Sequence, residues 1–169
     1  MAHALRDEGL DFADRAPVQV REEVVVTGAS PADVWPALAE PTAWTQWFAG
    51  MKETRYTSPA PYGVGTKRFV RVSSMKANEE VLAFDVAARF AFRVVDANMP
   101  ALRAMVEVVT LEAVDGGTRV VYRQAIEMEP WARWLGSLAR KQLSRSLKAS
   151  LPKLTGWVAA HPRPGGTGS

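Results

Sequence analysis

The C-terminal third of the chain carries the pattern that most restricts its fold, a long amphipathic helix. After Pro130, apolar residues recur at intervals of three and four, which places them on one face of an α-helix. They are Trp131, Trp134, Leu135, Leu138, Ala139, Leu143, Leu147, Leu151, Leu154 and Val158. Such a helix is roughly 40 Å long at 1.5 Å per residue. Its wide apolar stripe must be buried, so the rest of the chain has to supply an equally long apolar surface.

The preceding residues predict that this surface is an antiparallel sheet. Residues 18–27 are rich in valine and alternate between two faces, as in a half-buried strand. Six further strands are predicted over 51–57, 66–73, 79–84, 89–97, 102–113 and 118–128. The last two are joined by Asp115-Gly116-Gly117, whose residues tolerate the positive φ angles of a tight hairpin.

Two short helices are predicted between the first strand and the others. Ser30-Pro31-Ala32-Asp33 combines an N-cap serine, a proline at the first helical position and an acid in the first turn. A second short helix places Trp44, Trp47 and Phe48 on one face. Because these two helices are too short to cover a seven-stranded sheet, the long helix must lie across its concave side.

We therefore predict one α+β domain. Its 169 residues suffice for a single core. The domain is expected to occupy residues 17–160, with residues 1–16 as a flexible N-terminal arm. Residues 161–169 are rich in proline and glycine and are predicted to form a disordered tail.

Composition excludes several kinds of chemistry. There is no cysteine, which rules out disulfides and thiolate catalysis and fits a cytoplasmic protein. The two histidines, His3 and His161, fall in the predicted flexible ends, so we expect neither a metal site nor a cofactor. The first residues lack the apolar core of a signal peptide, and no run of about 18 apolar residues predicts an integral membrane segment.

The charge is mildly basic, with a formal net charge of +3. Basic residues gather in the C-terminal segment at Arg133, Arg140, Lys141, Arg145, Lys148 and Lys153. We interpret them as a solvated helix face. Phosphate-binding loops and aromatic–basic RNA signatures are missing from the sequence, so no nucleic-acid partner is expected. A monomer or homodimer is predicted.

Strand alternation predicts which side chains face the long helix. On 118–128, Tyr122 and Gln124 belong to the more apolar face. On 102–113, we place Met105 and Glu107 inward, although the face of Ala104, Val106 and Val108 is nearly as apolar. The predicted ligand-binding residues are Glu80, Leu82, Phe84, Phe90, Phe92, Met105, Glu107, Tyr122, Gln124, Trp131, Trp134 and Leu138.

This set is mostly apolar with a few polar anchors, as small-molecule binding requires. An inward glutamate would lose hydration, so its pKa would rise and it could act as an acid or base. The alternative is structural, with Glu80 or Glu107 paired to an arginine such as Arg71 or Arg103. No catalytic residue is assigned.

Five motifs in this order resemble one superfamily. They are Ser30-Pro31-Ala32-Asp33-Val34-Trp35, Trp44-Thr45-Gln46-Trp47-Phe48, Gly63-Val64-Gly65-Thr66, Asn78-Glu79-Glu80-Val81 and Gly116-Gly117-Thr118-Arg119-Val120. Over about Val18 to Ala160 the chain resembles the START-like, or SRPBCC, helix-grip superfamily, and within it the polyketide cyclase/dehydrase group. The resemblance implies a curved seven-stranded antiparallel sheet around a long C-terminal helix, with two short helices after strand 1 and a hydrophobic cavity.

The leading functional hypothesis is the binding, with transport or modification, of a hydrophobic small molecule such as a lipid, polyketide or isoprenoid. The first alternative is an enzyme of the aromatase/cyclase or dehydratase kind that uses glutamate, tyrosine and arginine in the cavity. The second is a salt-sensitive interaction module whose basic helix face contacts a membrane or a protein.

Overall fold

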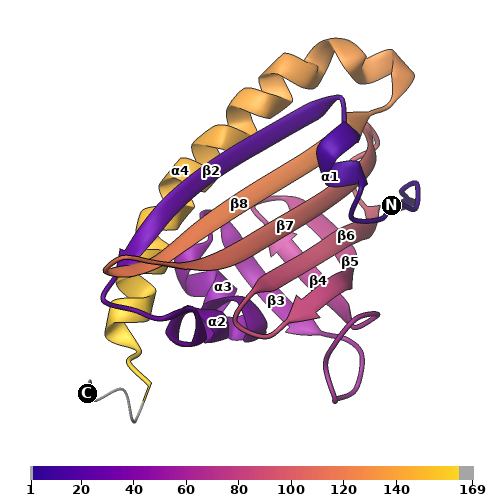
Figure 1. Cartoon of the computed structure of the whole chain (residues 1–169). Coiled ribbons are helices and arrows are strands. Elements are labelled where there is room, and N and C mark those ends of the chain that lie inside the picture. The colour runs from indigo at the N-terminus through magenta and orange to yellow at the C-terminus, as the bar shows by residue number, and fades with distance from the viewer. Residues whose placement is uncertain (1, 164–169) are drawn as a thin grey trace.

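A strongly curved antiparallel sheet wraps around one side of a long helix in the computed structural model, which describes residues 2–163 (Figure 1). The main path of the sheet runs in the order β2-β8-β7-β6-β5-β4-β3. These strands are β2 (Val18–Thr27), β3 (Met51–Tyr56), β4 (Lys67–Val72), β5 (Met75–Asp85), β6 (Arg89–Ala97), β7 (Leu102–Val114) and β8 (Gly117–Met128). The short β1 (His3–Ala4) pairs with β6 outside this path. The predicted curved seven-stranded sheet is confirmed.

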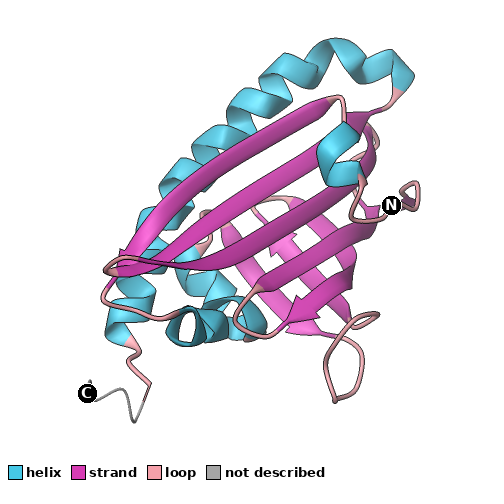
Figure 2. Ribbon diagram, in the orientation of Figure 1, coloured by secondary structure: helices cyan, strands magenta, loops and turns pink. Residues whose placement is uncertain are grey.

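The two short helices and the long C-terminal helix occupy the predicted positions, except that residues 130–135 form a separate 3₁₀ helix (Figure 2). They are α2 (Pro31–Ala39), α3 (Pro41–Trp47), the 3₁₀ helix η1 (Pro130–Leu135) and α4 (Gly136–Ala160). A capping box starts α2, because Ser30 Oγ accepts from the amide of Asp33 and Asp33 Oδ2 accepts from the amide of Ser30. Helix α4 packs mainly along β2, which completes the helix-grip architecture (Figure 1). No helix within residues 2–163 is both long enough and apolar enough to cross a bilayer.

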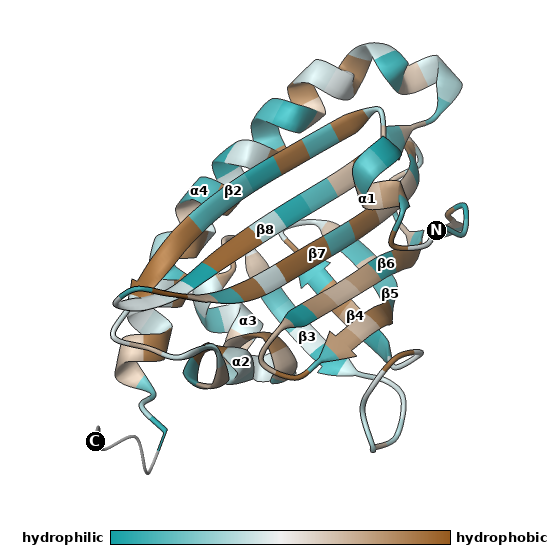
Figure 3. Ribbon diagram, in the orientation of Figure 1, coloured by the Kyte–Doolittle hydropathy of each residue, from teal (hydrophilic) through white to brown (hydrophobic). Residues whose placement is uncertain are grey.

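The main core lies between the concave face of the sheet and the helices. Hydrophobic and hydrophilic residues alternate along much of the strands (Figure 3), and successive side chains of a strand point to opposite faces of the sheet. Trp44 and Trp47 of α3 are buried in this core, and their indole N–H groups donate to the carbonyls of Leu38 and Ala37, each at 2.9 Å. Because both polar atoms are satisfied, these large rings contribute their full apolar area to the core.

The convex face of the sheet carries a second apolar cluster that the sequence analysis did not predict. Helix α1 (Phe12–Arg15) belongs to the segment predicted as a flexible arm, yet the Phe12 ring is buried against the convex face. The neighbouring strand residues are small, and include Ala91, Ala104 and Ala125. They leave room for one aromatic ring, so residues 2–16 cover the sheet instead of lying apart from it. The flexibility of this segment stays a prediction.

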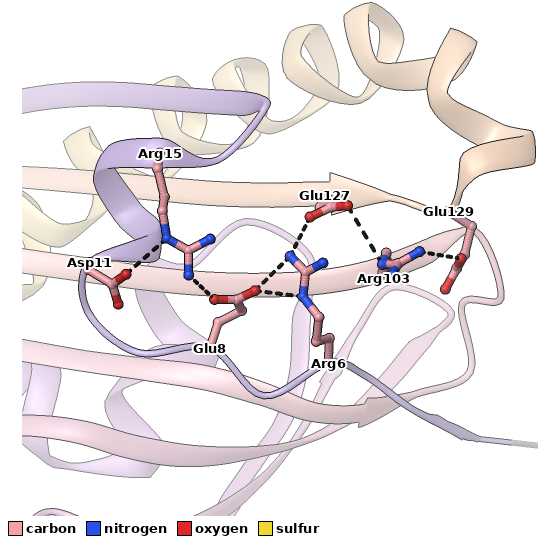
Figure 4. A network of polar contacts seen from close by, with 7 residues as sticks. All are labelled: Arg6, Glu8, Asp11, Arg15, Arg103, Glu127 and Glu129. Carbon is pink, nitrogen blue, oxygen red and sulfur yellow. Dashed lines mark hydrogen bonds and ion pairs between the residues drawn. The ribbon is translucent and has the colours of Figure 1, made fainter.

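An ionic network fastens the same segment to the sheet (Figure 4). Glu8 accepts from both Arg6 and Arg15, and its side chain is almost fully buried between them. Arg6 also forms an ion pair with Glu127 on β8, and Glu127 in turn contacts Arg103 on β7 at 3.6 Å. The exposed pairs contribute only about 0–1 kcal/mol each, so most of the stabilisation at this face comes from burying Phe12.

The described part of the predicted tail folds back on the domain. His161 stacks on Trp157 with ring centroids 4.2 Å apart, and Arg163 donates to the carbonyl of Ala32 at 3.1 Å. The remaining tail residues, 164–169, lie outside the described residues.

Candidate functional site

A cavity of about 210 Å³ lies between the concave face of the sheet, α3 and the first half of α4. Most of its wall is apolar. Five of the six methionines of the chain line it, namely Met51, Met75, Met99, Met105 and Met128. Methionine is flexible and polarisable, so such a wall adapts to guests of different shape.

Three polar side chains from β7 and β8 meet at one side of this cavity. Glu107 and Gln124 are directly paired across the two strands, and Tyr122 lies on the same face. The hydroxyl of Tyr122 and Nε2 of Gln124 both donate to Oε2 of Glu107, the latter at 3.1 Å. The register of the hairpin therefore builds a carboxyl group held by two donors.

Burial raises the pKa of Glu107 to about 7, helped by the negative charge of nearby Glu79 and opposed by the hydrogen bonds from Tyr122 and Gln124. Burial also raises the pKa of Tyr122 well above its ordinary value, and the adjacent Glu107 adds to the rise. Tyr122 therefore stays a hydrogen-bond donor, whereas Glu107 changes its charge near neutral pH.

A buried ion pair lies in the part of the wall formed by β4 and β5. Arg68 on β4 is 1% exposed and pairs across strands with Glu79 on β5, with Nε donating to Oε2 at 2.7 Å. Its guanidinium carbon lies 4.5 Å from the centroid of the Trp44 ring and 4.3 Å from that of Phe92. Burial raises the pKa of Glu79, and the charge of Arg68 opposes that rise. Cation–π contacts and the carboxylate together compensate the loss of hydration of the guanidinium.

Three buried polar atoms of cavity-lining side chains lack a hydrogen-bond partner within residues 2–163. They are Nη1 and Nη2 of Arg68, both donors, and Oε1 of Gln124, an acceptor. Nη2 still lies 2.7 Å from Oε2 of Glu79 as part of the ion pair. An unsatisfied buried polar group costs about 1–3 kcal/mol. The cavity therefore offers the guanidinium of Arg68 as a donor and the amide oxygen of Gln124 as an acceptor to a guest.

The structure brings together five of the predicted ligand-binding residues. Phe92, Met105, Glu107, Tyr122 and Gln124 all line the cavity. The alternative orientation of β7 is wrong, because Ala104, Val106 and Val108 pack in the convex cluster.

Phe84 and Phe90 face the same core but lie behind the cavity wall. Their rings are 5.8 Å apart, and Trp35 of α2 contacts both, at 5.1 Å from Phe84 and 6.3 Å from Phe90. Within the described chain these phenylalanines close one end of the core, and neither belongs to the cavity lining.

The predicted inward orientation of Glu80 and Leu82 is wrong. Glu80 pairs with Arg93 at 3.4 Å outside the cavity, and Leu82 packs against the convex cluster. A β-bulge is the reason, since Val81 pairs with Phe92 and Ala83 with Ala91, which leaves Leu82 unpaired. Two successive residues, Leu82 and Ala83, thus take the convex side, and the alternation reverses before Phe84.

The prediction that Trp131, Trp134 and Leu138 line the cavity is also wrong. Their side chains are 64%, 77% and 61% exposed. The spacing of apolar residues after Pro130 predicts one α-helix, whereas residues 130–135 form a 3₁₀ helix with three residues per turn. The change of pitch rotates the two tryptophans out of the stripe, and Ala139 and Leu143 face the cavity instead.

Sequence reasoning missed the ion pair of Arg68 and Glu79. A usable signal existed, because Arg68 shares its strand face with Val70 and Val72 in the alternation of β4. The proposed arginine partners for a cavity glutamate were wrong as well: Arg71 contacts Glu53 at 3.6 Å, and Arg103 contacts Glu127 and Glu129 on the sheet exterior. Over residues 2–163, no three His, Cys, Asp or Glu side chains are grouped as a metal site would need.

A bent sheet that grips a long helix around an apolar cavity defines a START-like helix-grip domain. Within that class, the chain belongs to the family described as polyketide cyclase/dehydrase and lipid transport, whose model matches residues 17–156. Membership of this family indicates hydrophobic-ligand binding or cyclase activity. The resemblance found in the sequence is confirmed.

The chain is also similar to individual proteins. An uncharacterised protein of Mycobacterium tuberculosis is 29% identical over 153 residues, which cover 90% of this chain and 91% of that protein. A START superfamily protein from Mycobacterium smegmatis has a TM-score of 0.70 at 12% identity, over 85% of this chain and 98% of the other. The Zhui aromatase/cyclase from Streptomyces sp. R1128 has a TM-score of 0.65 at 17% identity, over 88% and 97%. These two structural likenesses concern the fold alone.

Proposed function

We propose that this protein binds a hydrophobic small molecule that carries oxygen at one end, such as a polyketide, an isoprenoid or a lipid, to carry or modify it. One observation carries the proposal, namely an apolar cavity whose unpartnered polar atoms belong to Arg68 and Gln124. A wholly apolar guest would leave these atoms unsatisfied, whereas a hydroxyl or enol group would accept from Arg68 and donate to Gln124.

The size of the cavity limits which guests can fit. An apolar cavity of about 150 Å³ binds benzene, and ligand pockets usually start at about 300 Å³. At about 210 Å³, the enclosed part of the guest is larger than a single unsubstituted ring. The methionines in the wall support a range of ring or chain shapes.

A displacement assay tests this proposal. The apolar dye N-phenyl-1-naphthylamine is bound first, and naphthalene and 2-naphthol then compete with it. We expect 2-naphthol to displace the dye at lower concentration than naphthalene, because only its hydroxyl can pair with both Arg68 and Gln124. Leu143→Trp fills the cavity from α4 and should abolish dye binding, whereas Leu138→Trp, on the exposed side of the same helix, should not. No dye uptake by the unchanged protein, or equal uptake by both variants, would refute the proposal.

A second candidate function is an aromatase/cyclase or dehydratase, favoured by the position of Glu107. Its carboxyl group ionises near neutral pH and borders the cavity, as a general base requires. The carboxylate of Glu107 would take a proton from the carbon next to a carbonyl group, and the electron pair of that C–H bond would move to the carbonyl oxygen. Arg68 would then stabilise the resulting enolate. Turnover of a poly-β-ketone analogue that survives Glu107→Gln would exclude this assignment.

Cytoplasmic location, a monomeric or homodimeric state and the lack of a nucleic-acid partner stay predictions. The lack of cysteine supports the first of these. Cell fractionation, light scattering and a nucleic-acid mobility-shift assay would test them in turn.

A further inference from the structure

An exposed apolar patch lies where η1 joins α4. Trp131, Trp134 and Leu138 follow one another at intervals of three and four residues, and each exposes more than half of its side chain. The indole N–H of Trp134 donates to the carbonyl of Trp131 at 3.2 Å, so the polar edge of this ring is satisfied locally. Large exposed apolar side chains that are grouped in this way mark a contact surface rather than ordinary surface variation.

The same segment has a charge pattern unlike the rest of the chain. Residues 130–160 contain six basic side chains and no acidic one. All eleven arginines before Pro130 form ion pairs. By contrast, Arg133, Arg140 and Arg145 form none with any residue from 2 to 163, although such pairs are frequent elsewhere in the protein. Their charge is therefore available to an external anionic partner.

These basic residues also share a place in the fold. Arg140, Lys141, Arg145 and Lys148 surround a shallow depression on the exposed side of α4. Lys148 lies 3.8 Å from Glu22, at the far end of this group. Leu138, Lys141 and Arg145 are three and four residues apart, so the apolar patch and the basic stripe continue along one face of the helix.

The patch borders the opening of the cavity. Met99 and Gln142 both line the cavity and reach solvent, which places the mouth between the β6–β7 loop and α4. That loop is held beside η1 by a hydrogen bond from the amide of Glu129 to the carbonyl of Ala101, at 2.9 Å. A surface on which Trp131 and Trp134 rest would therefore lie next to the mouth.

We propose that η1 and the exposed face of the first half of α4 dock onto an anionic lipid bilayer. Tryptophan rings favour the membrane interface, where their apolar body and polar edge are both accommodated. Lysine and arginine next to them gain from the negative surface potential of anionic lipids. A uniformly anionic surface complements a helical segment that carries no acidic residue of its own, whereas a protein partner would usually present charges of both signs. This proposal goes beyond ligand binding, and it gives an apolar guest a route between bilayer and cavity.

Vesicle flotation tests the docking directly. We expect binding to phosphatidylcholine vesicles that contain phosphatidylglycerol, weaker binding to pure phosphatidylcholine, and a steep loss with added salt. The double variant Trp131→Ala and Trp134→Ala should lose binding. Val86→Ala removes another exposed apolar side chain, from the turn between β5 and β6, and should not change it.

The charges are tested separately. Arg140→Ser combined with Lys141→Ser should weaken binding roughly thirtyfold, because each basic residue near an anionic surface contributes about fivefold. Lys52→Ser combined with Lys67→Ser removes the same charge elsewhere and should bind nearly as well as the unchanged protein.

The outcomes separate docking from cavity binding. The tryptophan variant should keep its unfolding temperature and its displacement of N-phenyl-1-naphthylamine by 2-naphthol, since both side chains are exposed and outside the cavity. Failure to bind anionic vesicles, or undiminished binding by this variant, overturns the docking proposal and leaves the ligand proposal standing. Tryptophan-dependent self-association without vesicle binding overturns it in favour of a second copy as partner.

Discussion

Glu107 offers the sharpest test of the site, because its burial makes stability depend on pH. Its pKa rises from 4.5 in the unfolded chain to about 7 in the folded protein. Between these pH values the folded state binds one more proton than the unfolded state, so the free energy of unfolding falls as pH rises. At about 1.4 kcal/mol per pH unit, the folded protein loses about 3 kcal/mol between pH 4.5 and 7.

Replacing Glu107 with glutamine should remove this dependence. Glutamine keeps an oxygen to accept from Tyr122 and Gln124 but cannot ionise. Urea unfolding, followed by tryptophan fluorescence from pH 5 to pH 8, measures both proteins. The difference in unfolding free energy between the two proteins removes the contribution of most other titrating groups. As pH rises, this free energy should increase by about 3 kcal/mol for Glu107→Gln relative to the unchanged protein.

Glu80→Gln makes the same chemical change on β5 outside the cavity and serves as the matched control. The difference in unfolding free energy between Glu80→Gln and the unchanged protein should not change comparably with pH. If the difference between the unchanged protein and Glu107→Gln stays constant over this range, the carboxyl group is not desolvated in the folded state and the reasoning fails.

Three further predictions concern stability and use urea unfolding. Phe12→Ala should cost about 3–5 kcal/mol, because the ring is fully buried on the convex face; a cost under about 1 kcal/mol would mean that the segment is detached in solution. Arg68→Ala should lower the free energy of unfolding by about 3–5 kcal/mol, because it leaves Glu79 buried without its partner. Converting both residues to methionine should restore most of that loss. No recovery in the double variant would show that the ion pair itself is the main source of stability. Ser30→Ala should cost about 1 kcal/mol through loss of the capping box, and an unchanged midpoint would show that the cap is not needed to hold α2.

Local patterns were enough to predict most of the architecture. Alternation groups Met105 with Glu107 on β7 and Tyr122 with Gln124 on β8, because side chains in a strand point alternately to opposite sides, but it leaves open which face of β7 points inward. The Ser30 cap and the leucine spacing of α4 likewise depend only on near neighbours in the chain. Each of these features is set by interactions within a few residues.

Other features of the site depend on how distant segments are aligned. The bulge at Leu82 arises from the pairing of β5 with β6, and it decides that Glu79 rather than Glu80 borders the cavity. The partner of Arg68 follows from the register between β4 and β5.

The sequence by itself determined most of the strands and helices and their order, since periodicity and caps are local properties. Only the tertiary structure decided which polar side chains meet in the cavity, that Phe12 covers the convex face, and that Trp131 and Trp134 point to solvent. The physical reason is that a one-residue offset in strand pairing, or a change of helical pitch, turns a side chain to another face while leaving the local pattern unchanged.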